Sequence, residues 1–101
     1  MTVQPGPLNL ITDVGGLTVG HATDDHAGTG VTALVCEGFW SGAADIRGGG
    51  PGTRETNALA AESLNGKAHA LVLSGGSVYG LAAADGAVVA LAGKGRGLRL
   101  R

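Results

Sequence analysis

The 101-residue sequence contains few aromatic residues: one Phe, one Trp and one Tyr. Hydrophobic residues make up 44% of the chain, mostly as Ala, Val and Leu, and they accompany 20 glycines. Aromatic side chains bury the largest apolar areas, so their scarcity predicts a core built from small residues. Small residues favour closely packed helix-on-sheet layers, but they stabilise an isolated small domain poorly. We therefore expect the chain to depend on a partner or on further sequence.

Positive and negative residues nearly balance, at 7 and 8. The net charge of −1 provides no general field that would attract nucleic acid or acidic lipid. Four cationic residues gather near the end of the chain, and we expect them to form a solvated tail: Lys94, Arg96, Arg99 and Arg101. Neither a nucleic-acid partner nor a membrane partner is expected.

Cysteine and long apolar segments are nearly absent. The single cysteine, Cys36, excludes an internal disulfide and favours a reducing compartment. No apolar run approaches the roughly 20 residues of a membrane span. Residues 1–13 lack the charged start and apolar centre of a signal peptide. These shortages together predict a cytoplasmic protein.

The order of predicted elements indicates an α/β or α+β layer structure. Residues 1–9 are expected to be a flexible lead, and residues 10–101 the N-terminal part of one domain. Alternation of apolar and polar residues, together with turn signals, predicts a hairpin and then three strands, of which the last is buried: 8–24, 28–38, 39–47 and 68–76. Helix-forming composition predicts helices over 53–66 and 77–95. A further strand is predicted to begin at 98–101, which indicates that the chain is truncated or completed by a partner.

The second predicted helix carries a carboxylate among apolar residues. Spacings of three, four and seven residues predict one apolar stripe, made of Val78, Leu81, Ala82, Val89 and Ala92, and Asp85 lies on it. A carboxylate there must find a donor or tilt to the edge of the stripe and meet water, and the second outcome is favoured. Gly80 and Gly86 indicate that another backbone packs closely against this helix.

The stretch "DIRGGGPGTRET", residues 45–56, does not match the known phosphate-binding loops. It lacks the Gly-Lys-Ser/Thr ending of a Walker loop and the spacing of a dinucleotide fingerprint. Two interpretations remain equally open. The stretch is either a glycine turn held by a local network of Asp45, Arg47, Arg54 and Glu55, or the rim of a site.

The stretch "LSGGSVYGL", residues 73–81, places a glycine turn between a predicted strand and a helix. Its amide groups would favour an anion in front of the helix, and Ser77 is predicted to be the N-cap. The second glycine of a nucleophile elbow comes one residue late, at Gly80, so neither Ser74 nor Ser77 is favoured as a nucleophile.

The remaining polar and sulfur-bearing residues are expected to be structural. The stretch "HATDDH", residues 21–26, has no supporting cysteine pair, which favours a polar hairpin loop over a metal site. His69 is expected at the surface, and Cys36 as a small buried residue within a strand. No metal and no cofactor is expected.

Four motifs in order resemble the opening of the DmpA-type aminopeptidase family, which includes L-aminopeptidase/D-esterases and β-peptidyl aminopeptidases. They are "ITDVGGLTVGHATD", "GTGVTALV", "DIRGGGPGTRET" and "ALVLSGGSVYGLAAADGAVVAL", and the resemblance extends from Leu10 to Gly97. It implies a hydrolase whose precursor cuts itself into an α and a β chain. It also implies a four-layer α/β/β/α sandwich and assembly into homo-oligomers.

In this family the freed N-terminal Ser or Thr of the β chain is the nucleophile, and its own α-amine assists as the base. That residue, an oxyanion-stabilising Asn and a site Tyr would all lie beyond Arg101, and Tyr79 does not match the site Tyr. The resemblance thus implies pocket or scaffold roles here, for Asp45, Arg47, Gly49, Thr53, Glu55, Gly75, Gly76 and Ser77. The expected partners are a small peptide or amide substrate and the missing C-terminal part or β chain.

Two other classes of function stay open at this point. One is a small anion- or nucleotide-binding module that uses the glycine-rich loops at helix N-termini. The other is a non-catalytic fragment that is stable only when it packs against another copy of itself.

Overall fold

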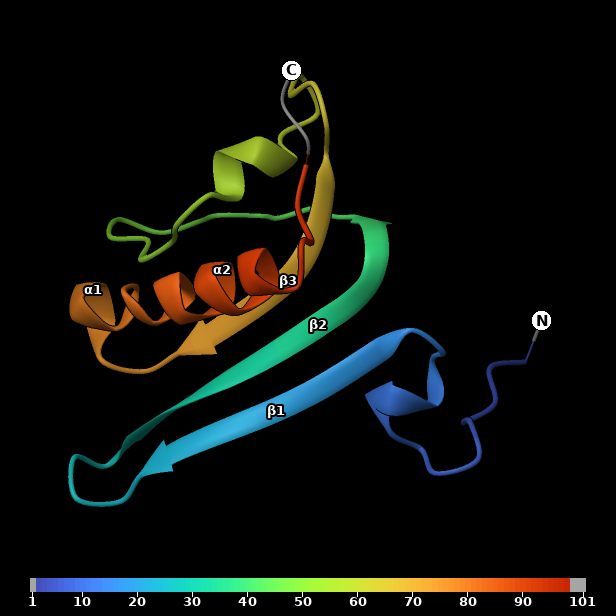
Figure 1. The fold of residues 1–101 in the computed structure, drawn as a ribbon, viewed down its shortest axis with the longest axis horizontal. Coiled ribbons are helices and arrows are strands. Elements are labelled where there is room, and N and C mark those ends of the chain that lie inside the picture. The colour runs from blue at the N-terminus through green and yellow to red at the C-terminus, as the bar shows by residue number, and fades with distance from the viewer. Residues whose placement is uncertain (1, 99–101) are drawn as a thin grey trace.

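The structure is a computed structural model and describes residues 2–98. Its centre is a three-stranded antiparallel sheet in the order β1-β2-β3 (Figure 1). The strands are β1 (Leu17–Asp24), β2 (Thr29–Ser41) and β3 (Lys67–Ser74). Two helices follow β3, α1 (Ser77–Gly80) and α2 (Ala83–Gly93), and α2 packs against β3. The expected α+β class is therefore confirmed.

The first predicted hairpin is wrong, because residues 8–24 contain one strand and not two. The Asp13 carboxylate accepts hydrogen bonds from the backbone amides of Leu8 and Leu10, at 3.1 and 3.2 Å. These bonds close a local turn that leads into the short 3-10 helix η1 (Ile11–Asp13). The amides that a strand would donate are used locally, so β1 pairs with β2 instead.

The strand predicted over residues 39–47 is wrong as a separate element. Its first residues continue β2, which bends where the pairing with β3 shifts register between Val35 and Trp40. Gly38 has a φ of 76°, and the indole nitrogen of Trp40 donates to the Glu37 carbonyl at 2.9 Å. A glycine in the left-handed region and a local side-chain bond are typical of a β-bulge, which bends a strand without ending it.

The helix predicted over residues 53–66 is also wrong. The structure forms only a 3-10 turn there, η2 (Thr56–Leu59). Glu55, just before this turn, has a left-handed φ of 62°. The carbonyl of Asn57 accepts bonds from the Ala60 amide and from the Ser63 hydroxyl, the latter at 2.7 Å. Local side-chain bonding of this kind competes with the α-helical pattern.

The predicted strand over 68–76 is confirmed as β3, and the predicted helix over 77–95 is confirmed as α1 and α2, interrupted at Leu81 and Ala82. The predicted apolar stripe on the helix is right only at Leu81. Val78 and Val89 are 64% and 72% exposed, and the half-buried positions are Leu81, Ala83, Ala84, Ala87 and Leu91. The helix is apolar on several sides, so apolar spacing alone does not identify the face that packs.

Burial is low throughout residues 2–98, where Cys36, at 6% exposure, is the single buried hydrophobic residue. The accessible surface is 8055 Å², whereas a folded monomer of 9.8 kDa is expected to expose about 5,200 Å². The radius of gyration is 15.3 Å, against about 13 Å for a compact domain of this length. The elements therefore form one layer of strands and one of helix, without the surfaces that would enclose them.

The face of the sheet away from α2 is uncovered by the described residues. Leu71 and Leu73 on β3 are 51% and 62% exposed, so α2 covers the opposite face, which carries Ala70 and Val72. The strand predicted to be buried at 68–76 is thus open on one side. The strand predicted at 98–101 lies outside the described residues except for Leu98.

Candidate functional site

The glycine-rich loop of residues 45–56 has little regular structure, and its internal polar contacts are short in range. Asp45 and Arg47 form an ion pair at 2.9 Å between Oδ2 and Nε, with both side chains well exposed. The hydroxyls of Thr53 and Thr56 lie 3.1 Å apart. Gly49 has open space around it. An exposed ion pair of this kind contributes little stability by itself.

Arg54 connects this loop to the helices. Its Nη2 lies 2.6 Å from Oδ1 of Asp85 on α2, and its Nη1 donates to the Leu81 carbonyl at 3.4 Å. The hydrogen bond to Asp85, followed by the charge of that carboxylate, raises the pKa of Arg54 above its ordinary value. An arginine guanidinium is charged across the range in which proteins fold, so this contact is an ion pair.

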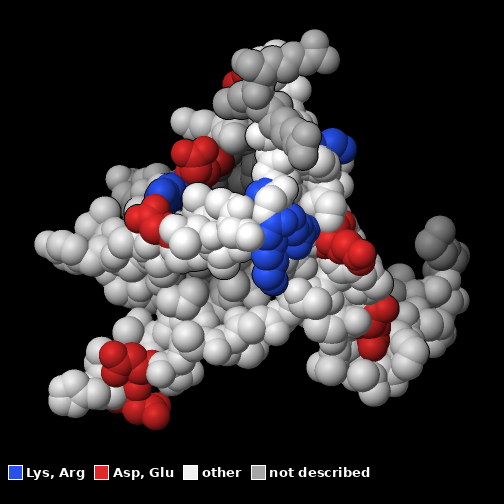
Figure 2. All heavy atoms as spheres, viewed as in Figure 1, with Lys and Arg blue, Asp and Glu red and all other residues white. Residues whose placement is uncertain are grey.

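These contacts correct the predicted local network. Asp45 and Arg47 do pair, but the partner of Arg54 lies 31 residues further along the chain. They also show how the carboxylate of Asp85 is accommodated on the helix. It is exposed to water and also accepts a hydrogen bond from Arg54. On the face drawn in Figure 2, basic and acidic side chains lie next to one another at several places. The spacing of residues within the loop gave no signal of a partner so distant in sequence.

The turn of residues 74–80 brings β3 against β2 and then starts α1. The amide of Gly75 donates to the Gly30 carbonyl at 3.0 Å, and the amide of Gly80 donates to the Gly76 carbonyl at 3.1 Å. Ser77 was wrongly predicted as the N-cap. The N-cap is Gly76, with a φ of 95° and no side-chain capping bond, and Ser77 has a φ of 57°.

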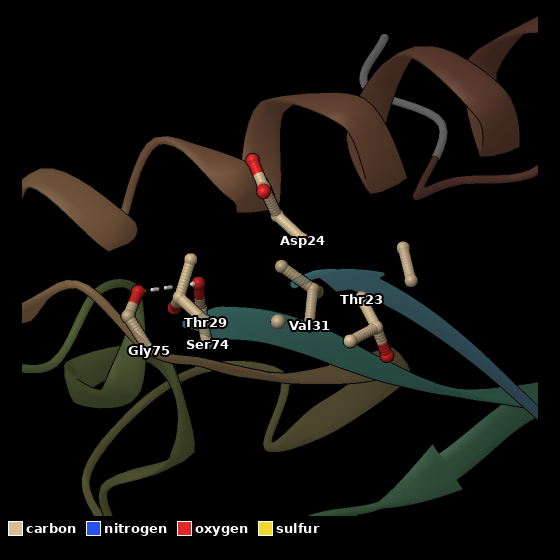
Figure 3. A pocket seen from close by; sticks show the side chains of 8 residues that line it. Thr23, Asp24, Thr29, Val31, Ser74 and Gly75 are labelled. Atoms are coloured by element: carbon tan, nitrogen blue, oxygen red, sulfur yellow. Dashed lines mark hydrogen bonds between the residues drawn. The ribbon is translucent and has the colours of Figure 1, made fainter. Parts of the chain in front are cut away.

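An open hollow of about 230 Å³ lies where the ends of the three strands meet (Figure 3). Its polar lining residues are Thr23, Asp24, Thr29 and Ser74, and its backbone lining includes Gly75. Ser74 Oγ donates to the Gly75 carbonyl at 3.0 Å. Sequence reasoning interpreted Asp24 only as part of a polar hairpin loop and did not identify Thr29. Only the antiparallel register, which places Val31 opposite Ser74, brings the hairpin to this turn.

The two predicted site segments approach the same pair of helices. Gly75, Gly76 and Ser77 form the entry to α1. Arg54 contacts Leu81, which lies between the two helices, and Asp85 in the first turn of α2. Within residues 2–98, no side-chain hydrogen bond or ion pair joins the other loop candidates to this turn: Asp45, Arg47, Gly49, Thr53 and Glu55. Both segments therefore lie beside the helical segment of α1 and α2, but their side chains do not form one site.

His21, His69 and Cys36 lie in structural surroundings. His21 lies on β1, with Nδ1 2.8 Å from the Thr32 hydroxyl. His69, which was expected at the surface, is instead half-buried, and its ring meets Phe39 edge-on with centroids 4.5 Å apart. Cys36 is buried as predicted, and Nη2 of Arg96 donates to its carbonyl.

In the described ranges no helix has the length and apolarity to cross a bilayer.

The arrangement can shape a pocket, but it does not bring a nucleophile to a base. The bond found for Ser74 is to a backbone carbonyl, and no hydrogen bond joins Ser74 or Ser77 to a histidine among the residues that the structure describes. A hydroxyl nucleophile needs an adjacent base to react. What these residues offer is two glycine-rich backbone segments fixed beside one helix layer.

Comparison with known sequences identifies the class as a peptidase. The model of Peptidase family S58 matches residues 9–98. This is the family of the DmpA aminopeptidase. The chain therefore belongs to Peptidase family S58, and the resemblance seen in its four motifs is confirmed.

Curated relatives agree with this assignment. An uncharacterized aminopeptidase of Mycobacterium leprae is 44% identical over 94 residues, covering 85% of this chain and 26% of its own length. Uncharacterized aminopeptidases of Mycobacterium tuberculosis and Mycobacterium bovis are each 48% identical over 87 residues, covering 78% of this chain and 25% of their own lengths. The chain thus spans about a quarter of the length of these relatives.

Proposed function

We propose that the 101 residues are the N-terminal part of the α chain of a self-processing aminopeptidase. The intact enzyme removes N-terminal residues from small peptides, or hydrolyses amino-acid amides and esters. The family match over residues 9–98 is the observation that carries this proposal. It also favours a peptidase over the anion- or nucleotide-binding module considered from sequence.

In this proposal the reactive group lies beyond Arg101. Self-cleavage would free an N-terminal Ser or Thr, whose α-amine takes the proton from its own hydroxyl as that oxygen attacks the substrate carbonyl. No cofactor takes part. The absence of a base beside Ser74 or Ser77 in the described residues supports a nucleophile located elsewhere.

We also propose that the rest of the protein covers the open face of the sheet and completes a four-layer α/β/β/α sandwich. The large accessible surface and the exposed Leu71 and Leu73 support this, because the apolar face of a sheet is normally packed against another layer. The completed domain would form homo-oligomers in the cytoplasm.

The test uses aminoacyl p-nitroanilides as substrates and follows nitroaniline release. The full-length protein should hydrolyse them after self-cleavage, and purified residues 1–101 should show no turnover. Absence of aminopeptidase activity in a cleaved, folded full-length protein would refute the assigned reaction. Hydrolysis by residues 1–101 would refute the claim that the nucleophile lies elsewhere.

A further inference from the structure

The glycine-rich loop has one side-chain connection to the helix layer. Arg54 reaches Asp85 at 2.6 Å and the Leu81 carbonyl at 3.4 Å. The other side-chain bonds of the loop, between Asp45 and Arg47 and between Thr53 and Thr56, stay within it. Arg54 is therefore the residue through which the described part of the loop is fixed to α2.

Packing does not replace this connection. At four glycines of the loop, a side chain would meet nothing within 4 Å: Gly48, Gly49, Gly50 and Gly52. Glycines without packing partners leave the backbone many accessible conformations, and ordering them costs entropy. A loop of this composition takes a defined position only where a specific contact fixes it.

The chemistry of Arg54 suits this task. Its planar guanidinium presents several donors in a fixed geometry, so it can bind a carboxylate and a carbonyl together, which a lysine ammonium does less well. Its two acceptors, on Leu81 and Asp85, lie just beyond the turn at Gly75 and Gly76. The contact thus joins the loop to the helical segment that follows this turn.

We propose that Arg54 and Asp85 are positioning residues that fix the glycine-rich loop against α2, and that the loop held there forms one wall of the pocket for the substrate's N-terminal residue. This inference rests on the proposed function for its substrate and for the pocket. Neither side chain takes part in bond cleavage. Losing the pair therefore weakens substrate binding more than it slows the chemical step.

The experiment compares four forms of the full-length protein: wild type, Arg54→Met, Asp85→Asn and the double variant. Each single variant should raise KM for an aminoacyl p-nitroanilide about fivefold, with kcat changed less than about twofold. The double variant should resemble either single variant, because both remove the same contact. Arg54→Lys, which keeps the charge and loses the fork geometry, should restore KM only in part. Lys94→Gln, a charge removal elsewhere on the surface, should leave KM unchanged.

Hydrogen exchange measured by mass spectrometry provides a readout that is independent of activity. In Asp85→Asn, amides of residues 48–56 should exchange faster, while those of β3 stay unchanged. Unchanged loop exchange, additive effects in the double variant, or equal losses in kcat and kcat/KM with constant KM would each overturn the inference. Faster loop exchange in an enzyme whose wild type lacks aminopeptidase activity would overturn the proposed function while upholding the positioning of the loop. If one of the other variants fails to fold, KM and loop hydrogen exchange are both measured on Arg54→Lys instead.

Discussion

The backbone of Gly80 lies against the carbonyl of Gly75, so closely that a side chain at Gly80 would overlap the oxygen. This contact brings the end of β3 and the first helical turn together. Sequence reasoning predicted close backbone packing at both Gly80 and Gly86. The prediction is confirmed at Gly80, whereas at Gly86 a side chain would meet nothing within 4 Å in the described residues.

This difference predicts opposite effects for two identical substitutions. Gly80→Ala should lower the free energy of unfolding by about 1–3 kcal/mol, because the methyl group has no space. Gly86→Ala should raise it by about 0.5–1 kcal/mol, since alanine is the better helix former. Urea denaturation of the full-length protein measures both. A destabilising Gly86→Ala would show that the rest of the protein packs its backbone on this face of α2.

A second glycine pair tests the junction before β1. Gly16 has a φ of 86°, and a side chain there would approach the Trp40 ring at 3.1 Å, whereas Gly15 has open space. Gly16→Ala should cost about 1–2 kcal/mol, because the left-handed region disfavours a side chain. Gly15→Ala should stay within about 0.5 kcal/mol. Equal unfolding midpoints for the two variants would contradict the backbone conformation found here.

The burial of Cys36 predicts slow reaction of its thiol. At 6% exposure within β2, it should react with a disulfide reagent only when the sheet opens. The labelling rate of the native full-length protein should therefore rise steeply with urea and reach that of a free thiol after unfolding. Rapid labelling of Cys36 in the native protein would be inconsistent with the described packing.

The open face of the sheet is tested by introducing a charge. Leu71→Asp should lower the free energy of unfolding of the full-length protein by more than about 2 kcal/mol, because a covered site would bury an unpaired carboxylate. Val3→Asp, at a position 91% exposed, should change it by less than about 0.5 kcal/mol. If Leu71→Asp proves as mild as Val3→Asp, the face is not covered and the four-layer arrangement fails.

The strand β3 and the helical segment after it could be predicted from sequence. Each is a run of mainly apolar residues, and Gly75–Gly76 marks the boundary between them. The failures at residues 8–24 and 53–66 share one cause. At Asp13, Glu55 and Ser63, local hydrogen bonds or a left-handed φ override propensity, and sequence patterns register such choices poorly.

In the candidate site too, some features could be predicted from sequence and others could not. The family and the two glycine-rich segments followed from the order of motifs, and the family is confirmed. The contact between Arg54 and Asp85, and the hollow beside Thr29, depend on tertiary register. Composition and spacing contain no information on such long-range pairs. The roles predicted for Asp45, Arg47 and Gly75–Ser77 remain predictions.

The location of the nucleophile is tested most directly by a covalent probe. The full-length protein, after self-cleavage, is treated with a serine-directed reagent, and the adduct is mapped by mass spectrometry. We expect the adduct on the new N-terminal Ser or Thr of the second chain, with residues 1–101 unmodified. An adduct on Ser74, Ser77 or any other residue of these 101 would contradict the account.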